Sequence, residues 1–249
     1  ERVKLFATAQ YGPVSGNAKL KTALANHMVG VYGGSIQSNN VLISAGCNQA
    51  YCLATMALAE AGDEIILPVP YYFNHQMWLE VLGIKAVHLG CNMSQGGLPE
   101  IDEARRLIGK KTKAIVLVTP NNPTGATYPP DLLQGFFKLC QKHGIKLIID
   151  ETYKDFLTEQ PPHQLFEISD WEETLIQVYS FSKCFSLTGY RVGSVIAGEN
   201  VIESATKIMD SVVICAPRIA QDAALYGLEH LTSWVAEKRN MLKKRRELF

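Results

Sequence analysis

The 249-residue sequence lacks the features that mark several classes of protein. No stretch is long and apolar enough to span a bilayer as a helix. The opening residues, 1–6, form a segment too short and too charged for a signal peptide. There is no internal repeat and no low-complexity linker. These absences argue against a membrane protein or a repeat array, and no membrane partner is expected.

An excess of charge of either sign is also missing. The chain has 24 basic and 24 acidic residues, so no global field favours nucleic acid or an anionic membrane. The run at 238–247 is basic on several faces, but no aromatic residue interleaves with it. A solvated helix surface is the better interpretation, and no nucleic-acid partner is expected.

The cysteines form no recognisable metal or redox motif. None of them makes a CxxC pair, and no His/Cys cluster has metal-ligand spacing, so no metal is predicted. Scattered thiols are typical of a reducing intracellular compartment, which predicts a cytoplasmic protein. Cys184 stands beside Lys183, but no histidine is placed to activate it, so it is interpreted as an apolar filler.

The middle of the chain alternates apolar strands with amphipathic helices. This pattern predicts an α/β fold, a mainly parallel sheet covered by helices on both faces. The predicted strands are 41–44, 64–70, 84–89, 113–119, 145–150, 174–179 and 191–197. The predicted helices are 17–29, 98–108 with Pro99 near its start, 132–141, 200–209, and a helical region from 217 onward. A further helix follows the turn at 45–48 and carries Tyr51, Leu53, Met56 and Leu58.

Polar residues follow several of these strands, at the edge where ligands bind in open α/β sheets. The strand at 174–179 runs into Ser180, Ser182 and Lys183, and Arg191 comes soon after. A lone lysine in such a place is most often a solvated surface residue. Its neighbours are what suggest a site.

A glycine turn follows the strand at 41–44. Gly46, Cys47 and Asn48 lead directly into a predicted helix, whose first amides and dipole favour an anion such as phosphate. On its own this signal is weak, because most strand–glycine–helix turns bind nothing.

Other strand ends carry side chains suited to a flat ring. Tyr72 could form a stacking wall, although core packing is the simpler alternative, and Asn122 stands in what could be an ordinary Asn-Pro turn. Asp150 ends an apolar strand, where a carboxylate is costly to bury unpaired; we expect a ligand to supply its partner, the alternative being a helix N-cap. Tyr153 follows one helical turn on. His75 is interpreted as a hydrogen-bonded helix residue without a role.

One ligand would use all of these groups. It carries a phosphate, a flat ring with a basic nitrogen and a hydroxyl, and a group that reacts with an amine. Pyridoxal 5′-phosphate has each of these features. Desolvation and the nearby Arg191 are expected to lower the pKa of Lys183 and make it a usable amine.

The sequence resembles the class I/II aminotransferases, which are fold type I pyridoxal-phosphate enzymes. Four motifs carry the resemblance, in the family's order and spacing, over nearly the whole chain. They are Pro70-Tyr71-Tyr72, Asn121-Asn122-Pro123-Thr124-Gly125, Asp150-Glu151-Thr152-Tyr153 and the run at 180–193 with Lys183 and Arg191.

The resemblance implies that the catalytic residues are Lys183, Asp150 and Tyr153. Lys183 would form the Schiff base with the cofactor and then carry a proton, and Asp150 would pair with the protonated ring nitrogen. Tyr153 and Asn122 would bond the ring hydroxyl, Asn122 would also help to hold the substrate carboxylate, and Tyr72 would stack on the ring.

The resemblance also implies a phosphate site and a dimer. The phosphate would be held by Gly46, Cys47, Asn48, Ser180, Ser182 and Arg191. Tyr11 is similar to the tyrosine that reaches into the partner subunit's site, which implies a homodimer with shared active sites.

In this family a C-terminal small domain carries an arginine that grips the substrate carboxylate, and an N-terminal segment closes over the substrate. The resemblance covers neither part. We therefore expect residues 1–217 to be the cofactor-binding large domain, with 1–30 its dimer-contacting part. Residues 218–249 are expected to begin the helix that leads to a missing small domain.

The predicted reaction is amino transfer from an L-amino acid to a 2-oxo acid in two ping-pong half-reactions, in amino-acid metabolism and biosynthesis. Residues 70–74 and 214–217 are most similar to aminotransferases that act on methionine and aromatic amino acids. Two alternatives stay open: another pyridoxal-phosphate reaction on the same scaffold, such as β-elimination, and a truncated protein that binds cofactor without turnover.

Overall fold

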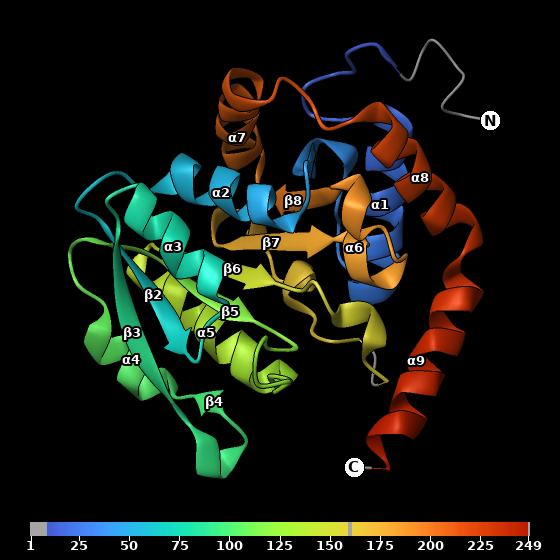
Figure 1. Cartoon of the computed structure of the whole chain (residues 1–249). Helices are drawn as coiled ribbons and strands as arrows, with labels where there is room; N and C mark the ends of the chain where they lie inside the picture. Colours follow the sequence, from blue (N-terminus) through green and yellow to red (C-terminus); the bar gives the residue numbers. More distant parts are fainter. Residues whose placement is uncertain (1–8, 159–160, 249) are drawn as a thin grey trace.

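The computed structural model describes residues 9–158 and 161–248 of the chain. In this part the strands form one eight-stranded sheet with helices packed on both faces (Figure 1). The strands are β1 (Val41–Ser44), β2 (Glu64–Val69), β3 (Lys85–Asn92), β4 (Leu98–Pro99), β5 (Thr112–Val118), β6 (Lys146–Asp150), β7 (Leu175–Ser180) and β8 (Gly193–Ala197).

The sheet is mainly parallel, which confirms the predicted fold class. Its strand order is β1-β8-β7-β6-β5-β2-β3-β4. The five strands from β7 to β3 run parallel to one another, whereas β8 is antiparallel to both β7 and β1, and β4 is antiparallel to β3. Strands β5, β6 and β7 are apolar along most of their length because helices cover them on both faces.

Helices α2, α3 and α7 cover one face of the sheet, and α1, α4 and α5 cover the other (Figure 1). The helices are α1 (Ala18–Tyr32), α2 (Cys47–Leu58), α3 (Phe73–Val81), α4 (Ile101–Leu107), α5 (Pro130–His143), α6 (Phe181–Cys184), α7 (Glu199–Val212), α8 (Arg218–His230) and α9 (Thr232–Arg246). Helix α5 packs on the sheet through one apolar face. Its residues Leu133, Phe136, Phe137 and Cys140 recur at helical spacing and are all buried.

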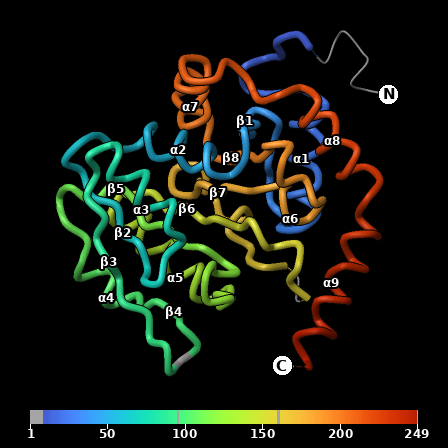
Figure 2. Tube along the Cα trace, in the orientation of Figure 1, coloured from blue at the N-terminus to red at the C-terminus, as the bar shows by residue number. Residues whose placement is uncertain are grey.

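Helix α1, near the start of the described chain, packs against helix α8, near its end. Figure 2 shows α1, in blue, beside α8, in red. The backbone N–H of Asn17, the N-cap of α1, donates to Gln221 Oε1 in α8 at 2.7 Å. Segments about two hundred residues apart therefore close one body around the sheet.

The predicted starts of two elements are wrong. Residues 98–108 do not form one helix: Leu98–Pro99 is the edge strand β4, where Cys91 pairs with Pro99, and the helix begins at Ile101. A proline is tolerated there because an edge strand has no partner for the missing N–H. The last strand begins at Gly193, and Arg191 precedes it with a φ of 55°.

The C-terminal region is helical, as predicted, but it is divided. Helix α8 ends at His230 and α9 starts at Thr232, with Leu231 between them. Helix α9 runs along one side of the molecule (Figure 1) and contacts the segment around η5 (Lys154–Phe156). Among the described residues, no helix has both the length and the apolar character that crossing a membrane requires.

We expect Phe136→Ala to lower the free energy of unfolding by about 3–5 kcal/mol, because the ring is fully buried and its loss leaves a cavity. Urea unfolding of the purified protein measures this. Phe73→Ala is the matched control: that ring is 60% exposed, and its loss should change the free energy of unfolding by less than about 0.5 kcal/mol. Equal losses in the two variants would contradict the assignment of α5 to the core.

Candidate active site

A cavity of about 180 Å³ opens where β5, β6 and β7 end and α2 begins. The parallel strands end in register, with Asp150 beside Val118 on one side and Val178 on the other. The cavity is lined by Cys47, Asn48, Tyr72, Val118, Asn122, Asp150, Thr152, Tyr153, Ser180, Ser182, Lys183, Thr188 and Arg191. The fold thus brings together all the residues predicted to form the site except Gly46, which lies in the adjoining turn, and Tyr11.

The carboxylate of Asp150 is held by the protein itself. Its Oδ2 lies 3.3 Å from His75 Nε2, and its Oδ1 accepts the N–H of Thr152 at 3.0 Å. Burial alone would raise the pKa of the Asp150 carboxyl, but the hydrogen bond and charge of His75, with the contacts of Thr152, bring that pKa below its usual value. Asp150 is therefore ionised at neutral pH.

His75 is a hydrogen-bonded residue of helix α3, as the sequence predicts. Its partner is Asp150, a contact that the sequence did not predict. The His75 ring is buried, stacks on Tyr51 with 4.1 Å between centroids, and meets Tyr72 edge-on. The spacing of Tyr72 and His75, one helical turn, predicts only that these two rings are neighbours, and no sequence signal points to the contact between His75 and Asp150.

The cavity also contains hydrogen-bonding and aromatic groups, from Tyr153, Asn122 and Tyr72. Burial and then the charge of Asp150 raise the pKa of Tyr153, while a hydrogen bond with Asn122 opposes the rise. The phenol of Tyr153 therefore keeps its proton at neutral pH and can donate it. Tyr72 is the N-cap residue of α3 and is half-buried.

The turn before α2 depends on glycine. Gly46 has a φ of 88°, and a Cβ at this position would lie 2.4 Å from Arg191 Nη2. The guanidinium of Arg191 thus lies against the turn, and its Nη1 donates to the Thr188 carbonyl at 2.8 Å. Gly193 packs on the same turn: a Cβ there would lie 2.6 Å from the carbonyl carbon of Gly46 and 2.7 Å from Cys47 N. A helix start with an arginine beside it is suited to a phosphate.

The two serines line the same part of the cavity. Ser180 Oγ accepts the N–H of Ser182 at 3.1 Å and so caps the short helix α6. Both side chains are largely buried. Each hydroxyl still has a proton that it can donate to a ligand.

Lys183 lies on α6 and lines the cavity, but its side chain is exposed. Helix α6 directs this side chain into the open cavity, while its neighbours Ser182 and Cys184 are buried. The expected cationic neighbour, Arg191, lines the same cavity.

Tyr11 lies outside the lining of the cavity, with its side chain 76% exposed. Thr152 and Thr188 are lining residues that were not predicted. Thr152 belongs to the Asp150–Tyr153 motif, and Thr188 stands three residues before Arg191, so both were within reach of the motifs.

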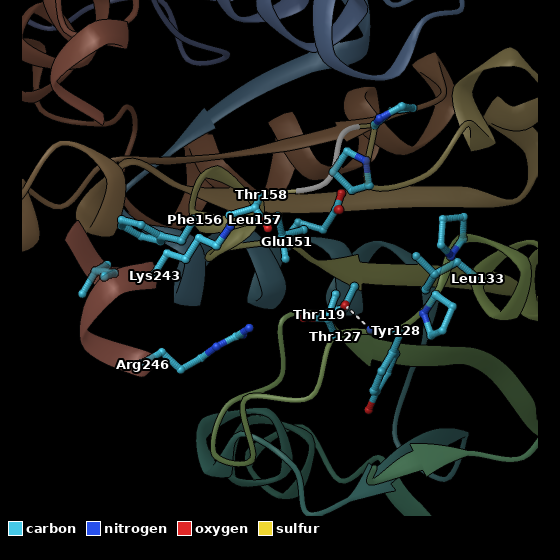
Figure 3. A pocket seen from close by; sticks show the side chains of 15 residues that line it. Thr119, Thr127, Tyr128, Leu133, Glu151, Phe156, Leu157, Thr158, Lys243 and Arg246 are labelled. Carbon is cyan, nitrogen blue, oxygen red and sulfur yellow. Dashed lines mark hydrogen bonds between the residues drawn. The ribbon is translucent and has the colours of Figure 1, made fainter. Parts of the chain in front are cut away.

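A second hollow, of about 430 Å³, lies beside Glu151 (Figure 3). Asp150 and Glu151 are adjacent, and successive side chains of an extended chain point in opposite directions. Glu151 is fully buried and pairs with His163 at 3.2 Å, and Lys243 and Arg246 reach toward the hollow from α9 (Figure 3). The lining of this hollow contains none of the residues predicted to bind a cofactor.

Within residues 9–158 and 161–248, no three His, Cys, Asp or Glu side chains are grouped so that they could hold a metal ion. All six cysteines are free. The cavity at the sheet edge therefore offers organic groups, an acid, an amine, a guanidinium and hydroxyls, rather than a metal-ligand set.

A lysine, an ionised acid and an anion site at the carboxyl edge of a mainly parallel sheet define a site of the kind found in pyridoxal-phosphate enzymes. Comparison with known families agrees. Residues 6–249 match the family described as aminotransferase class I and II, and the chain belongs to this family.

Characterised relatives share about a third of their aligned residues with the chain. It is 31% identical over 246 residues to an aromatic aminotransferase (ISS1) of Arabidopsis thaliana, covering 96% of this chain and 61% of the relative. It is 32% identical over 240 residues to an aspartate aminotransferase of Sulfurisphaera tokodaii, covering 96% of this chain and 60% of the relative. The chain thus spans about 60% of the length of these relatives.

Solved structures show the same fold. The aromatic aminotransferase of Pyrococcus horikoshii superposes with a TM-score of 0.91 at 28% identity, over 97% of this chain and 66% of that one. The aspartate aminotransferase of Thermus thermophilus with maleate gives a TM-score of 0.91 at 28% identity, over 97% of this chain and 64% of that one.

Members of this family use pyridoxal phosphate, and the residues present fit it. Gly46 and Gly193 leave open a turn that any Cβ would fill, so backbone amides can approach a phosphate. Asp150 is ionised in advance, as a partner for a protonated ring nitrogen must be. Lys183 supplies an amine in the same cavity.

We expect Gly193→Ala to weaken pyridoxal phosphate binding by about tenfold or more, because the new Cβ would overlap the backbone of Gly46 and Cys47 and displace the turn. Absorbance titration of the cofactor-free chain gives the dissociation constant. The control is Gly30→Ala in α1, where a Cβ meets nothing within 4 Å and should stabilise the helix by about 0.5–1 kcal/mol. Unchanged affinity in Gly193→Ala would contradict a phosphate site at this turn.

Proposed function

We propose that the protein is a pyridoxal-phosphate-dependent aminotransferase that moves an amino group from an L-amino acid to a 2-oxo acid. One observation carries the proposal. A single cavity holds the amine of Lys183, the ionised carboxylate of Asp150 and the guanidinium of Arg191 at the start of a helix. Membership of the aminotransferase class I and II family supports the same reaction.

Asp150 would hold the proton on the ring nitrogen of the cofactor. When bound, the cofactor supplies an aldehyde carbon that combines with amines and a ring that accepts electrons. Asp150 serves the ring because His75 and the N–H of Thr152 keep its carboxylate ionised before any ligand arrives. A neutral acid at this position would leave the ring nitrogen without a counter-charge.

Three further side chains would orient the ring. The phenol of Tyr153 keeps its proton and would donate it to the ring hydroxyl, together with the amide of Asn122. Tyr72 would lie against the face of the ring. Asn122 would also help to hold the substrate carboxylate, since it lines the cavity beside Tyr153.

The phosphate would bind where α2 begins. The N–H groups of Cys47 and Asn48 are free at the helix start, and the hydroxyls of Ser180 and Ser182 line the same cavity. Arg191 would supply the fixed positive charge. Gly46 would let the phosphate approach the backbone, because no side chain fills the turn.

Lys183 would carry the covalent attachment and the proton transfer. Its exposed side chain has four flexible carbons, so the amine can bind the cofactor, leave it when the substrate amine takes its place, and remain nearby. The released amine of Lys183 would then move the proton from the substrate α-carbon toward the cofactor.

The substrates and the assembly are also proposed. Relatives are named aspartate and aromatic aminotransferases, which supports an acidic or aromatic L-amino acid as donor and a role in amino-acid biosynthesis.

The exposed ring of Tyr11 supports a homodimer in which it reaches the partner's site. Six free thiols support a cytoplasmic location. Residues 1–217 would be the cofactor-binding domain, and 218–249 would begin the connection to a small domain.

Lys183→Ala should abolish the covalent link to the cofactor. After incubation with pyridoxal phosphate and reduction with borohydride, peptide mass spectrometry should find the added cofactor on Lys183 of the natural protein and on no residue of the variant. Lys207→Ala, which changes an exposed lysine on α7, should label like the natural protein. Equal labelling of the Lys183→Ala variant would contradict the assignment of this lysine.

Amino transfer is tested by its products. The cofactor-loaded protein, mixed with aspartate, phenylalanine, tyrosine or methionine and no acceptor, should form about one 2-oxo acid per bound cofactor and release no ammonia. Adding a second 2-oxo acid as the amino acceptor should then allow repeated turnover. Release of ammonia would contradict transfer and favour elimination, and absence of any 2-oxo acid would contradict an active enzyme.

A further inference from the structure

The thiol of Cys47 lies against the acid on which the proposed chemistry depends. Cys47 is the first residue of α2, and its Sγ lies 3.7 Å from Asp150 Oδ1, within range of a hydrogen bond to sulfur. The residue lines the cavity together with Asp150 and Arg191. Its backbone N–H belongs to the proposed phosphate site, while its side chain contacts the proposed partner of the ring nitrogen.

The thiol is one of several protein groups in contact with Asp150. One carboxylate oxygen, Oδ2, faces His75 at 3.3 Å. The other, Oδ1, faces both the N–H of Thr152 at 3.0 Å and the thiol of Cys47. These three groups come from α3, from the segment after β6 and from α2, so each ties a different element to the same carboxylate.

The thiol is suited to donate rather than to react. Burial and then the charge of Asp150 raise the pKa of Cys47 well above its usual value, while contacts with Thr152 and Arg191 oppose the rise. A thiolate at this position would face the carboxylate of Asp150 at close range. At neutral pH the sulfur therefore keeps its proton, which can point at Oδ1.

We propose that Cys47 is a positioning residue, whose S–H donates to Asp150 and fixes the start of α2 relative to the acid. The inference rests on the proposed roles of Asp150 and of the turn in cofactor binding. One residue then links the two ends of the cofactor site, the phosphate turn through its N–H and the ring-nitrogen acid through its thiol. Serine in place of Cys47 would keep the donor, and alanine would remove it.

The first test needs neither cofactor nor substrate, so it stands even if the proposed reaction does not. The cofactor-free protein is alkylated with iodoacetamide across a range of pH, and each cysteine peptide is followed by mass spectrometry. Cys47 should react as a thiol whose apparent pKa lies well above the ordinary value of about 8.5. In Asp150→Asn that pKa should fall, so that Cys47 reacts about tenfold faster at pH 8.

Two controls keep this test specific. Asp102→Asn changes an acid on α4 that is 76% exposed, and it should leave the Cys47 rate unchanged. Cys140 is fully buried, so its continued protection shows that Asp150→Asn is folded. If Cys47 reacts at the same rate in the folded Asp150→Asn variant as in the natural protein, the thiol does not sense the charge of the acid and the proposal is overturned.

The second test measures the contact's effect on the cofactor. Cys47→Ala should weaken pyridoxal phosphate binding by about threefold to tenfold, the size expected for one lost hydrogen bond. It should also shift the pH at which the absorbance of the bound cofactor changes. Cys47→Ser should restore both properties to within about twofold of the natural protein. Equal defects in the alanine and serine variants would show that Cys47 acts through packing and not through a donated hydrogen bond. Natural behaviour in both variants would show that its side chain does not contribute to cofactor binding. Either result overturns the proposal.

Discussion

The buried carboxylate of Asp150 is the constraint on which the rest of the site depends. An ion at the end of an apolar strand costs several kcal/mol unless other groups compensate it. This chain compensates it with the imidazole of His75, the N–H of Thr152 and the thiol of Cys47. Because these groups belong to separate elements, α2, α3 and β6 must come together before the acid is tolerated, and their packing and the ionisation of Asp150 support each other.

The other end of the cavity is governed by space rather than by charge. Gly46 and Gly193 allow the turn before α2, the strand β8 and the guanidinium of Arg191 to approach more closely than any side chain would permit. The cation and the free amides of the helix start therefore face the same volume. A cationic turn at one end and an anion at the other suit a ligand with a phosphate at one end and a basic nitrogen at the other.

Two adjacent acids show how environment decides function. Asp150 faces the cavity, whereas Glu151 turns away into a fully buried pair with His163, beside the larger hollow. Contacts with His163 and Gln177 lower the pKa of Glu151 despite its burial, so both acids are charged. The proposed chemistry belongs to Asp150 alone because only its carboxylate lines the cavity with Lys183.

The sequence by itself determined the class of fold, the strand ends and nearly all of the residues around the cavity, since apolar runs, glycine turns and motifs are local properties. Even so, Leu98–Pro99 proved to be an edge strand, because its pairing with β3 depends on a distant segment. Tertiary structure alone revealed that His75 is the partner of Asp150 and that Lys183 is exposed. The physical reason is that pairing and burial depend on which elements pack together across the fold, and no local pattern of residues encodes those contacts.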